Sequence, residues 1–249
     1  LPGLGAAAKK LFRIESPGPD PEGVRPTIRQ TARRLWTLYA GLTVAEIVLL
    51  LATGMGLFDA ANHTFTTLAT GGFSTRNASI ARPESLAAEI VLIVFMVLAG
   101  SNFTVLLALL KGRWKAAMAN TEFRIYLFCL LGGTLFITAA LIGHAEPLVL
   151  SNGADVPASA GESLRAAAFT VVSQQTTTGY TTFDFDLWPF AAKAMIIALM
   201  FIGGSAGSTA GGLKVVRVWI ALKVLWGQLE RFFRPNVIPP VLSPIPRIL

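Results

Sequence analysis

Cysteine and charged residues are scarce in this chain. Its 249 residues include one cysteine, Cys129, and two histidines, which excludes a disulfide framework and a thiolate metal cluster. Charged residues make up 14% of the chain, whereas an ordinary soluble domain has about 25%. Neither paired carboxylates nor a nucleophile beside a base is visible, which argues against an enzyme. With 53% hydrophobic residues and a mean hydropathy of +0.59, the composition is that of a membrane protein.

Long apolar runs take the place of charge. The runs 36–58, 86–110 and 123–143 each reach the length of about 20 residues that a helix needs to cross a bilayer core of about 30 Å. A fourth run extends from 188 to about 225 and is interrupted by a glycine-rich stretch. The sequence therefore predicts an all-α membrane protein with four crossings, the last of them broken.

Lysine and arginine are distributed unevenly along the chain, which carries a net charge of +7. Of the 21 basic residues, seven precede the first apolar run, four lie between the second run and the start of the third (Lys111, Arg113, Lys115 and Arg124), and six follow Leu213. By the positive-inside rule, both ends of this segment are expected in the cytoplasm. The positive charge is thus explained by membrane orientation, and we expect no nucleic-acid partner.

The two loops on the predicted outer side share one pattern. In each, a short and weakly apolar segment follows a carboxylate, Asp59 or Glu162, and ends at a run of threonine and glycine. These segments are too short to cross a membrane and predict re-entrant half-helices. Irregular backbone at that depth has to be buried in protein or line a water-filled cavity. The order span, half-helix, threonine-glycine run, span occurs twice and forms an internal repeat.

The predicted organisation has five parts: a cytoplasmic linker, a first repeat, a cytoplasmic loop, a second repeat with a broken last helix, and a proline-rich cytoplasmic tail. Their bounds are 1–35, 36–110, 111–122, 123–226 and 227–249. An insertion in the second repeat, 144–161, is expected to be a solvated loop without a site. Because the chain opens at Leu1 and shows no targeting segment, we expect it to be a piece of a longer polypeptide.

The threonine-glycine runs have the chemistry of a cation site. The C-terminal end of a half-helix carries partial negative charge toward the membrane centre, which favours a cation. Backbone carbonyls of an extended run can replace the water shell of an ion, and glycine permits the necessary dihedral angles. Neither run contains a carboxylate, which argues against a tight divalent-ion site. We therefore predict a weakly held monovalent cation and no cofactor.

Three stretches resemble the Trk/Ktr/HKT superfamily of potassium transporters, above all the bacterial Trk-type membrane subunit. GGFSTRNAS and TTTGYTTFDFDLWP are similar to its second and third selectivity-filter segments, and FIGGSAGSTAGGLKVVRV resembles the glycine-rich interruption of the last helix in its third repeat. The filter residues that the resemblance implies are Thr70, Gly71, Gly72 and Phe73 in the first run and Thr177, Thr178, Gly179 and Tyr180 in the second run. The implied gate under the filter comprises Gly203, Gly204, Gly207, Ser208, Thr209, Gly211, Gly212 and Lys214.

The resemblance also implies a function and partners. It implies transport of potassium ions, as substrate, through a filter of backbone carbonyls in the bacterial inner (plasma) membrane. It implies a homodimer of full-length subunits and a cytosolic nucleotide-binding regulatory subunit, and it leaves coupling to sodium or protons open. The family has four repeats, of which this chain matches two, so either the chain is a fragment or two copies associate. The alternatives are a non-conducting structural or assembly fragment and a sodium-permeable relative.

A few polar residues outside the runs have two interpretations each. Glu46 lies near the centre of the first apolar run, where an acid is a functional candidate because leaving it unpaired is costly; the alternative is a helix-pairing contact with Asn102 or a backbone group. Lys214 is either an anchor at the cytoplasmic interface or a charge that regulates cation passage near the gate. His63 and His144 are expected at the membrane interface.

Overall fold

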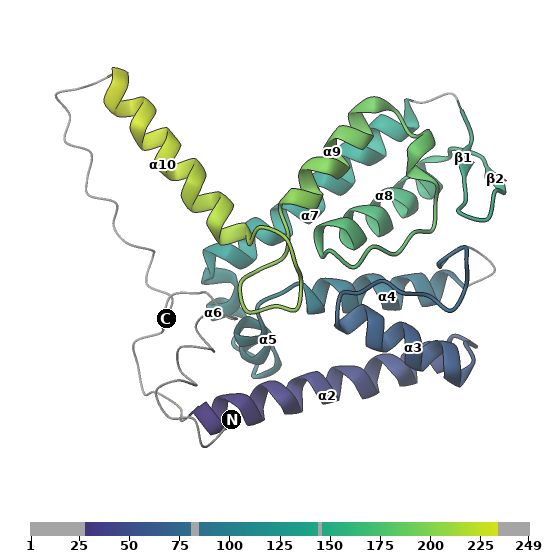
Figure 1. The fold of residues 1–249 in the computed structure, drawn as a ribbon, viewed down its shortest axis with the longest axis horizontal. Coiled ribbons are helices and arrows are strands. Elements are labelled where there is room, and N and C mark those ends of the chain that lie inside the picture. The colour runs from purple at the N-terminus through teal and green to yellow at the C-terminus, as the bar shows by residue number, and fades with distance from the viewer. Residues whose placement is uncertain (1–27, 81–84, 144–145, 234–249) are drawn as a thin grey trace.

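The computed structural model describes residues 28–80, 85–143 and 146–233 (Figure 1). In chain order the helices are α2 (Ile28–Ala52), α3 (Leu57–Leu68), α4 (Leu86–Ala99), α5 (Phe103–Leu110), α6 (Trp114–Ala119), α7 (Thr121–Ile142), α8 (Ala160–Gln175), α9 (Phe190–Phe201) and α10 (Val215–Phe233). Two short strands, β1 (Leu148–Val149) and β2 (Asp155–Val156), and a 3-10 turn at Phe185–Leu187 complete the described elements. The predicted all-α fold with two repeats is confirmed.

Two of the described helices are long and apolar enough to cross a membrane, judged by length and composition: Arg29–Ala52 and Thr121–Ile142. Helices α4 and α5 meet the same test only as a pair, and they are bent by 113° at the break between them. The run 86–110 is therefore not the continuous helix that its hydropathy predicts. Helix α9 has only 12 residues and is separated from α10 by an irregular segment, in line with the predicted broken last span.

The first helix differs from the predicted bounds at both ends. Helix α2 starts at Ile28, inside the predicted linker, and ends at Ala52 rather than at 58. A turn follows in which Gly54 has a φ of 93°, a left-handed conformation that glycine adopts readily and that ends helices. The two apolar residues at 57 and 58 belong to α3 instead. The rest of the predicted linker, 1–27, lies outside the described residues, as does 234–249 of the predicted tail.

The two predicted half-helices are α3 and α8. Each has a carboxylate in its first turn, Asp59 and Glu162 respectively, as the sequence predicts. In α8 the Ser159 hydroxyl accepts a hydrogen bond from the Glu162 N–H and caps the helix. Helix α3 packs mainly on α2, and α8 packs mainly on α7.

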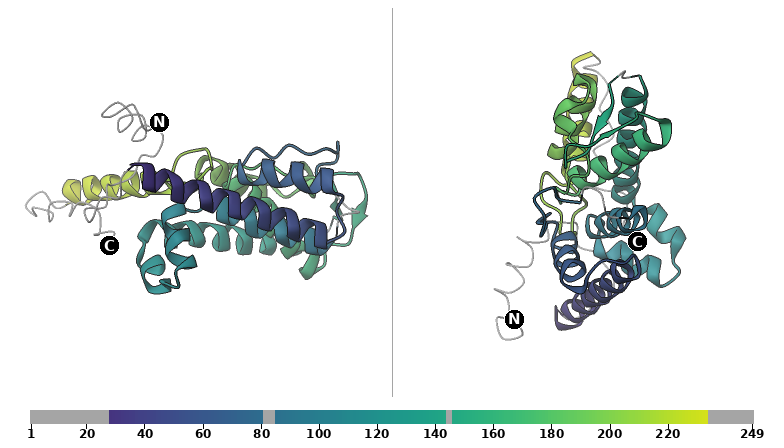
Figure 2. Two further views of the ribbon diagram at one scale, coloured as in Figure 1. Left: turned by 90° about the horizontal axis from the view of Figure 1, so that it is seen from below. Right: turned by 90° about the vertical axis from the view of Figure 1, so that its right-hand side faces the viewer.

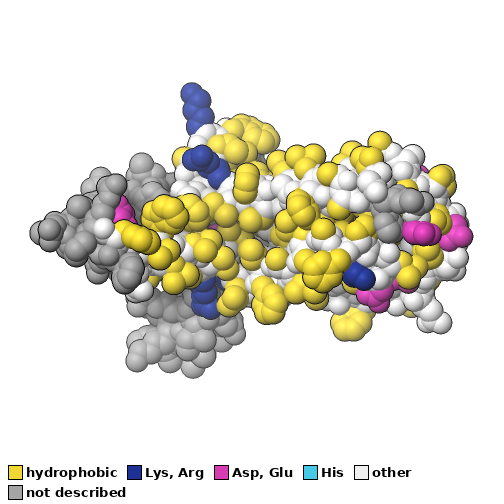
Figure 3. All heavy atoms as spheres, turned by 90° about the horizontal axis from the view of Figure 1, so that it is seen from above, with side chains coloured by type: hydrophobic (Ala, Val, Ile, Leu, Met, Phe, Trp, Pro, Cys, Tyr) yellow, Lys and Arg dark blue, Asp and Glu magenta, His cyan; other side chains and the backbone are white. Residues whose placement is uncertain are grey.

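The buried core lies around α7, α8 and α9 and reaches α4 of the first repeat. Its largest fully buried side chains include Tyr126, Phe169 and Tyr180. Helix α2 runs along the length of the molecule, and α10 projects beyond the remaining helices at one end (Figures 1 and 2). Figure 3 shows hydrophobic side chains across the face between the two ends. Such an apolar surface is what a lipid-facing protein requires.

The insertion 144–161 has a structural role that the sequence does not predict. Strands β1 and β2 pair antiparallel, with Leu148 opposite Val156. The hairpin also bonds to the segment after the second run: the Ser151 N–H donates to the Thr182 carbonyl (3.1 Å), and the Asp184 N–H donates to the Val149 carbonyl (2.8 Å). The insertion therefore supports the exit of the second run. Residues 144 and 145 lie outside the described part of the chain.

Candidate functional site

The first run (70–73) and the second run (177–180) have the same unusual backbone. Thr70 and Gly72 have φ angles of 52° and 62°, and Thr177 and Gly179, at the matching positions, have 58° and 86°. Left-handed backbone is uncommon for any residue other than glycine and is strained for a β-branched one such as threonine. The same strain at both positions indicates a conformation that the surrounding structure imposes.

Hydrogen bonds to the preceding half-helix hold each run in this conformation. In the first run, the N–H groups of Gly71 and Gly72 both point at the carbonyl of Thr66, at 2.7 and 3.3 Å. The Thr66 hydroxyl also donates to the carbonyl of Phe73 (2.8 Å). The backbone donors of the run are thus turned toward the last turn of α3.

The second run repeats these bonds atom for atom. The N–H groups of Thr178 and Gly179 point at the carbonyl of Ser173, at 2.9 and 3.2 Å, and the Ser173 hydroxyl donates to the carbonyl of Tyr180 (2.7 Å). Each residue lies 107 positions after its counterpart in the first run. The repeat is therefore one of geometry, even though the two runs differ at two of their four positions.

The carbonyls of the runs are left without donors. Within the described part of the chain, no N–H or O–H group is hydrogen-bonded to the carbonyl oxygens of Thr70, Gly71, Gly72, Thr177, Thr178 and Gly179. Thr70 and Thr178 are buried, Gly72 and Thr177 are half-buried, and Gly71 and Gly179 are exposed in this chain. Six unpaired oxygens in two adjacent runs form a set of acceptors that water or a cation can occupy.

The fold brings the two runs into contact. A Cβ atom placed on Gly72 would lie 1.9 Å from the carbonyl oxygen of Thr178, so only glycine fits at this position. The Tyr180 side chain is fully buried and crosses to α3. Its hydroxyl donates to the carbonyl of His63 (3.0 Å) and lies 2.5 Å from the Thr66 hydroxyl. Phe73, at the position that matches Tyr180, is 76% exposed.

The outer end of the first half-helix carries an ion pair. Arg76, which follows the first run, donates to the Asp59 carboxylate at 3.1 Å, and the Thr75 hydroxyl donates to the same group at 2.8 Å. These hydrogen bonds, first that of Thr75 and then that of Arg76, lower the pKa of Asp59. The carboxylate therefore stays charged at the start of α3, where the helix dipole also favours a negative charge.

The residues of the predicted gate form a loop, 203–212, that we call the glycine loop. It is tied to both runs through their first threonines. The Thr70 hydroxyl donates to the carbonyl of Thr209 (3.0 Å), and the N–H of Gly211 donates to the Thr177 hydroxyl (2.6 Å). Because Thr70 and Thr177 occupy matching positions, the loop bridges the inner ends of the two runs.

The glycine loop also fills the break between α4 and α5. The N–H of Ser205 donates to the carbonyl of Gly100 (2.9 Å), and the N–H of Phe103 donates to the carbonyl of Gly207 (3.2 Å). A side chain at Gly100 would meet the Tyr126 hydroxyl at 2.6 Å. The loop therefore supplies the hydrogen bonds that a continuous helix would have made, and this explains the bend in the 86–110 run.

Two charged side chains hold the far side of the loop. The Glu122 carboxylate, in the first turn of α7, accepts a hydrogen bond from the N–H of Ala206 (2.5 Å). The Lys214 ammonium donates to the carbonyl of Ala210 and interacts electrostatically with Glu122. Lys214 thus turns toward the loop, which favours the interpretation that it acts at the gate over that of an interfacial anchor. At the base, the N–H of Gly203 donates to the carbonyl of Leu213 (2.9 Å).

Comparison with known proteins identifies the family of this chain. The family model described as "TrkH: Cation transport protein" matches residues 2–242. The chain belongs to the TrkH cation transport protein family. The resemblance found in the sequence is therefore confirmed, and the family is named for transport rather than for a catalysed reaction.

The relatives of this TrkH-family chain are twice as long as the chain. The Trk system potassium uptake protein TrkH of Salmonella typhimurium is 37% identical over 240 residues, which are 96% of this chain and 48% of that protein. The Trk system potassium uptake protein TrkG of Escherichia coli is 30% identical over 96% of this chain and 47% of its own length. The crystal structure of the potassium transporter TrkH from Vibrio parahaemolyticus superimposes with a TM-score of 0.74 at 33% identity, over 87% of this chain and 45% of that one. The chain spans about half the length of the relatives it matches.

The surroundings of one histidine in this TrkH-family chain differ from those that the sequence predicts. His63 is fully buried rather than interfacial. Its Nε2 lies 3.1 Å from the Ser74 hydroxyl and its Nδ1 lies 3.4 Å from the Met55 sulfur, so it joins α3 to the segments on either side. The other predicted interfacial histidine, His144, lies outside the described residues. His63 shares the buried face of α3 with Ala60, Thr64, Thr67 and Leu68, a face that is mostly polar, so hydropathy gives no signal of its burial.

Glu46 is fully buried on α2. Neither carboxyl oxygen meets hydrogen-bond geometry with any described donor, although the Thr67 hydroxyl of α3 faces the group. The alternative of a contact with Asn102 is wrong, because Asn102 instead caps α5 by accepting from the N–H of Thr104 (2.8 Å). Glu46 therefore lies between α2 and α3, beside Thr67.

An ion pair between the two repeats went unpredicted. Arg165 of α8 donates to both carboxylate oxygens of Glu89 of α4, at 2.6 and 2.5 Å. The Glu89 side chain is 2% exposed and that of Arg165 is 13% exposed. This bidentate pair joins the second half-helix to the first repeat.

Proposed function

We propose that this chain supplies two filter segments and the gate of a membrane protein that moves potassium ions. The observation that carries the proposal is the set of six unpaired carbonyl oxygens where the two runs meet. The titles of the relatives, which name potassium uptake and a potassium transporter, agree with it.

The filter exchanges water oxygens for protein oxygens. A potassium ion that reaches the runs sheds its hydration shell, and the carbonyls of Thr70 to Gly72 and Thr177 to Gly179 replace it. The C-terminal ends of α3 and α8 both lead into the runs, so their partial negative charges also favour a cation. No covalent bond forms or breaks. Because the N–H groups are bonded to the half-helices, the carbonyls keep their direction as ions pass.

The glycine loop is proposed as the gate. It is bonded to the first threonine of each run and to the break between α4 and α5. A loop with five glycines in ten residues has little preference for one conformation, so it can move away once these bonds break. Glu122 and Lys214 hold the loop on the side opposite the runs.

The setting of the chain is part of the same proposal. We place it in the bacterial inner membrane with both ends of this segment in the cytoplasm, as the distribution of basic residues predicts. The family resemblance extends the proposal to a homodimer of complete subunits, each with four repeats, and to a cytosolic nucleotide-binding regulatory subunit. The regulatory subunit would meet the basic inner face.

The test is uptake of rubidium tracer into liposomes that contain the complete protein, with Gly179→Asp as the variant. Gly179 has a φ of 86° and no described atom lies within 4 Å of a built Cβ, so an aspartate there meets no steric clash and, with some backbone strain, places a charge beside the carbonyls. The matched control is Gly153→Asp, because Gly153 in the outer hairpin has a φ of 84° and equally open surroundings. We expect uptake to be lost in the first variant and kept in the second. Equal uptake by the two variants, or none by the parent, would refute the proposal, and faster entry of sodium than rubidium would reassign the ion.

A further inference from the structure

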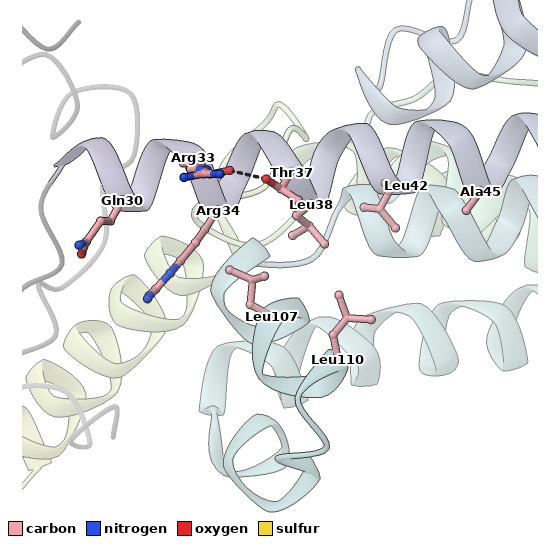
Figure 4. A pocket seen from close by; sticks show the side chains of 10 residues that line it. Gln30, Arg33, Arg34, Thr37, Leu38, Leu42, Ala45, Leu107 and Leu110 are labelled. Carbon is pink, nitrogen blue, oxygen red and sulfur yellow. Dashed lines mark hydrogen bonds between the residues drawn. The ribbon is translucent and has the colours of Figure 1, made fainter.

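A groove of about 630 Å³ lies between α2 and α5 (Figure 4). One wall is an apolar stripe on α2, and the other is formed by two leucines of α5 that point toward it. The lining apolar residues include Leu38, Gly41, Leu42, Ala45, Leu107 and Leu110. The groove exists because α5 bends away from α4 by 113° instead of continuing beside α2.

One end of the groove is basic. Arg33 and Arg34 line it there, about one turn before the apolar stripe that begins at Leu38, and both are exposed. Neither guanidinium forms an ion pair with any described carboxylate. Figure 4 shows the Arg34 side chain extending from α2 on the side of the groove. The groove thus has a charged head and an apolar body.

Exposed tryptophans near the basic end indicate its depth in a membrane. Trp36 on α2 is 75% exposed, and Trp114 at the start of α6 is 63% exposed. Tryptophan is enriched at the level of the lipid head groups. Arg33 and Arg34 precede Trp36 by less than one turn, so they lie at head-group level, and Leu38 to Ala45 lie deeper.

We propose that the groove binds an anionic phospholipid, with its phosphate on Arg33 and Arg34 and an acyl chain along α2 against α5. The planar fork of arginine suits phosphate oxygens, and basic pockets between membrane helices on the cytoplasmic side bind acidic head groups. A protein helix in the groove would have to bring its own carboxylates, because burying two guanidinium groups without a counter-charge is unfavourable. Gly41 keeps the floor of the groove open, since a Cβ built on it meets no atom within 4 Å.

The test is titration of phosphatidylglycerol into the delipidated complete protein, followed by native mass spectrometry. Two variants probe the two ends: Arg33→Gln with Arg34→Gln removes the head-group site, and Gly41→Leu fills the apolar body. Matched controls are Lys115→Gln with Arg124→Gln, which removes the same charge outside the groove, and Gly132→Leu, because a Cβ on Gly132 of α7 also meets open space.

We expect one phosphatidylglycerol to bind and phosphatidylcholine to bind more weakly. The arginine variant is expected to lower the affinity roughly 30-fold, since each basic residue near an anionic lipid contributes about 1 kcal/mol. Gly41→Leu should abolish binding, and both controls should bind as the parent does. Three results would each overturn the proposal: no lipid bound by the parent, as when another helix or a second copy fills the groove; inorganic phosphate displacing the lipid completely; or unchanged binding by Gly41→Leu.

Discussion

The contact between the two runs predicts that Gly72→Ala disrupts the filter. The added Cβ would lie 1.9 Å from the carbonyl oxygen of Thr178 and 2.8 Å from its carbon. Both are backbone atoms of the second run, so relief of the clash requires the run itself to shift by roughly 1 Å, a strain of about 1 to 3 kcal/mol. The left-handed φ of 62° adds about 1 to 2 kcal/mol for any residue with a Cβ.

The clash and the backbone strain can be separated with a matched variant. Gly112 has a φ of 70°, but a Cβ built there meets no atom within 4 Å, so Gly112→Ala carries the strain alone. We expect Gly112→Ala to lower stability by about 1 kcal/mol and to leave rubidium uptake unchanged. Gly72→Ala should cost about 2 to 5 kcal/mol and reduce uptake more than tenfold, because the displaced carbonyl belongs to the filter. Thermal unfolding in detergent and tracer uptake into liposomes measure the two effects. Equal behaviour of the two variants would show that the runs do not touch as described.

Three further predictions concern the bonds around the filter. Glu89→Ala leaves the largely buried Arg165 charge with only its longer contact to Glu162 (3.6 Å) and should lower stability by about 3 kcal/mol. Arg76→Ala, which breaks an exposed pair, should cost less than about 1 kcal/mol in the same unfolding assay. Similar losses in the two variants would mean that burial does not decide the effect. Thr177→Val removes the hydroxyl that accepts a hydrogen bond from Gly211 of the glycine loop, and it should raise basal rubidium leak. Thr177→Ser keeps the hydroxyl and should behave as the parent does. A leak in both variants, or in neither, would show that this hydrogen bond does not hold the loop. Glu122→Ala should speed amide hydrogen exchange in the glycine loop, and exchange in Glu122→Gln, which keeps an acceptor oxygen, should be slower than in Glu122→Ala. Exchange rates equal to those of the parent in both variants would show that Glu122 does not hold the loop.

The filter chemistry is predictable from sequence because it depends on local signals. Each repeat contains a carboxylate (Asp59 or Glu162), a short weakly apolar segment and a threonine-glycine run within about 15 residues of one another. The half-helices and the runs can therefore be predicted from the helix-start signal and from the length of the segment. The matching hydrogen bonds of Thr66 and Ser173 were not predicted, because two different side chains perform the same task.

The bend between α4 and α5 could not be predicted from hydropathy. The run 86–110 is mostly apolar, with Glu89, Ser101, Asn102 and Thr104 as its polar residues, and its one glycine, Gly100, is a residue that a membrane helix tolerates. Its helix ends because donors from the glycine loop, more than a hundred residues later, bond to the carbonyls of Ala99 and Gly100. A periodic pattern reports burial along one element and carries no information about such a partner.

The sequence by itself determined the environment and the chemistry of this protein. It contains apolar runs that suit a membrane, two half-helices with a carboxylate in the first turn, and two threonine-glycine runs without carboxylates. The tertiary structure decided which of these elements meet. It set Gly72 against Thr178, turned the glycine loop under both runs, and buried His63 and Glu46. The physical reason is the range of the interactions, since caps and turns act over a few residues, whereas the contacts that align the carbonyls join backbone atoms about a hundred residues apart.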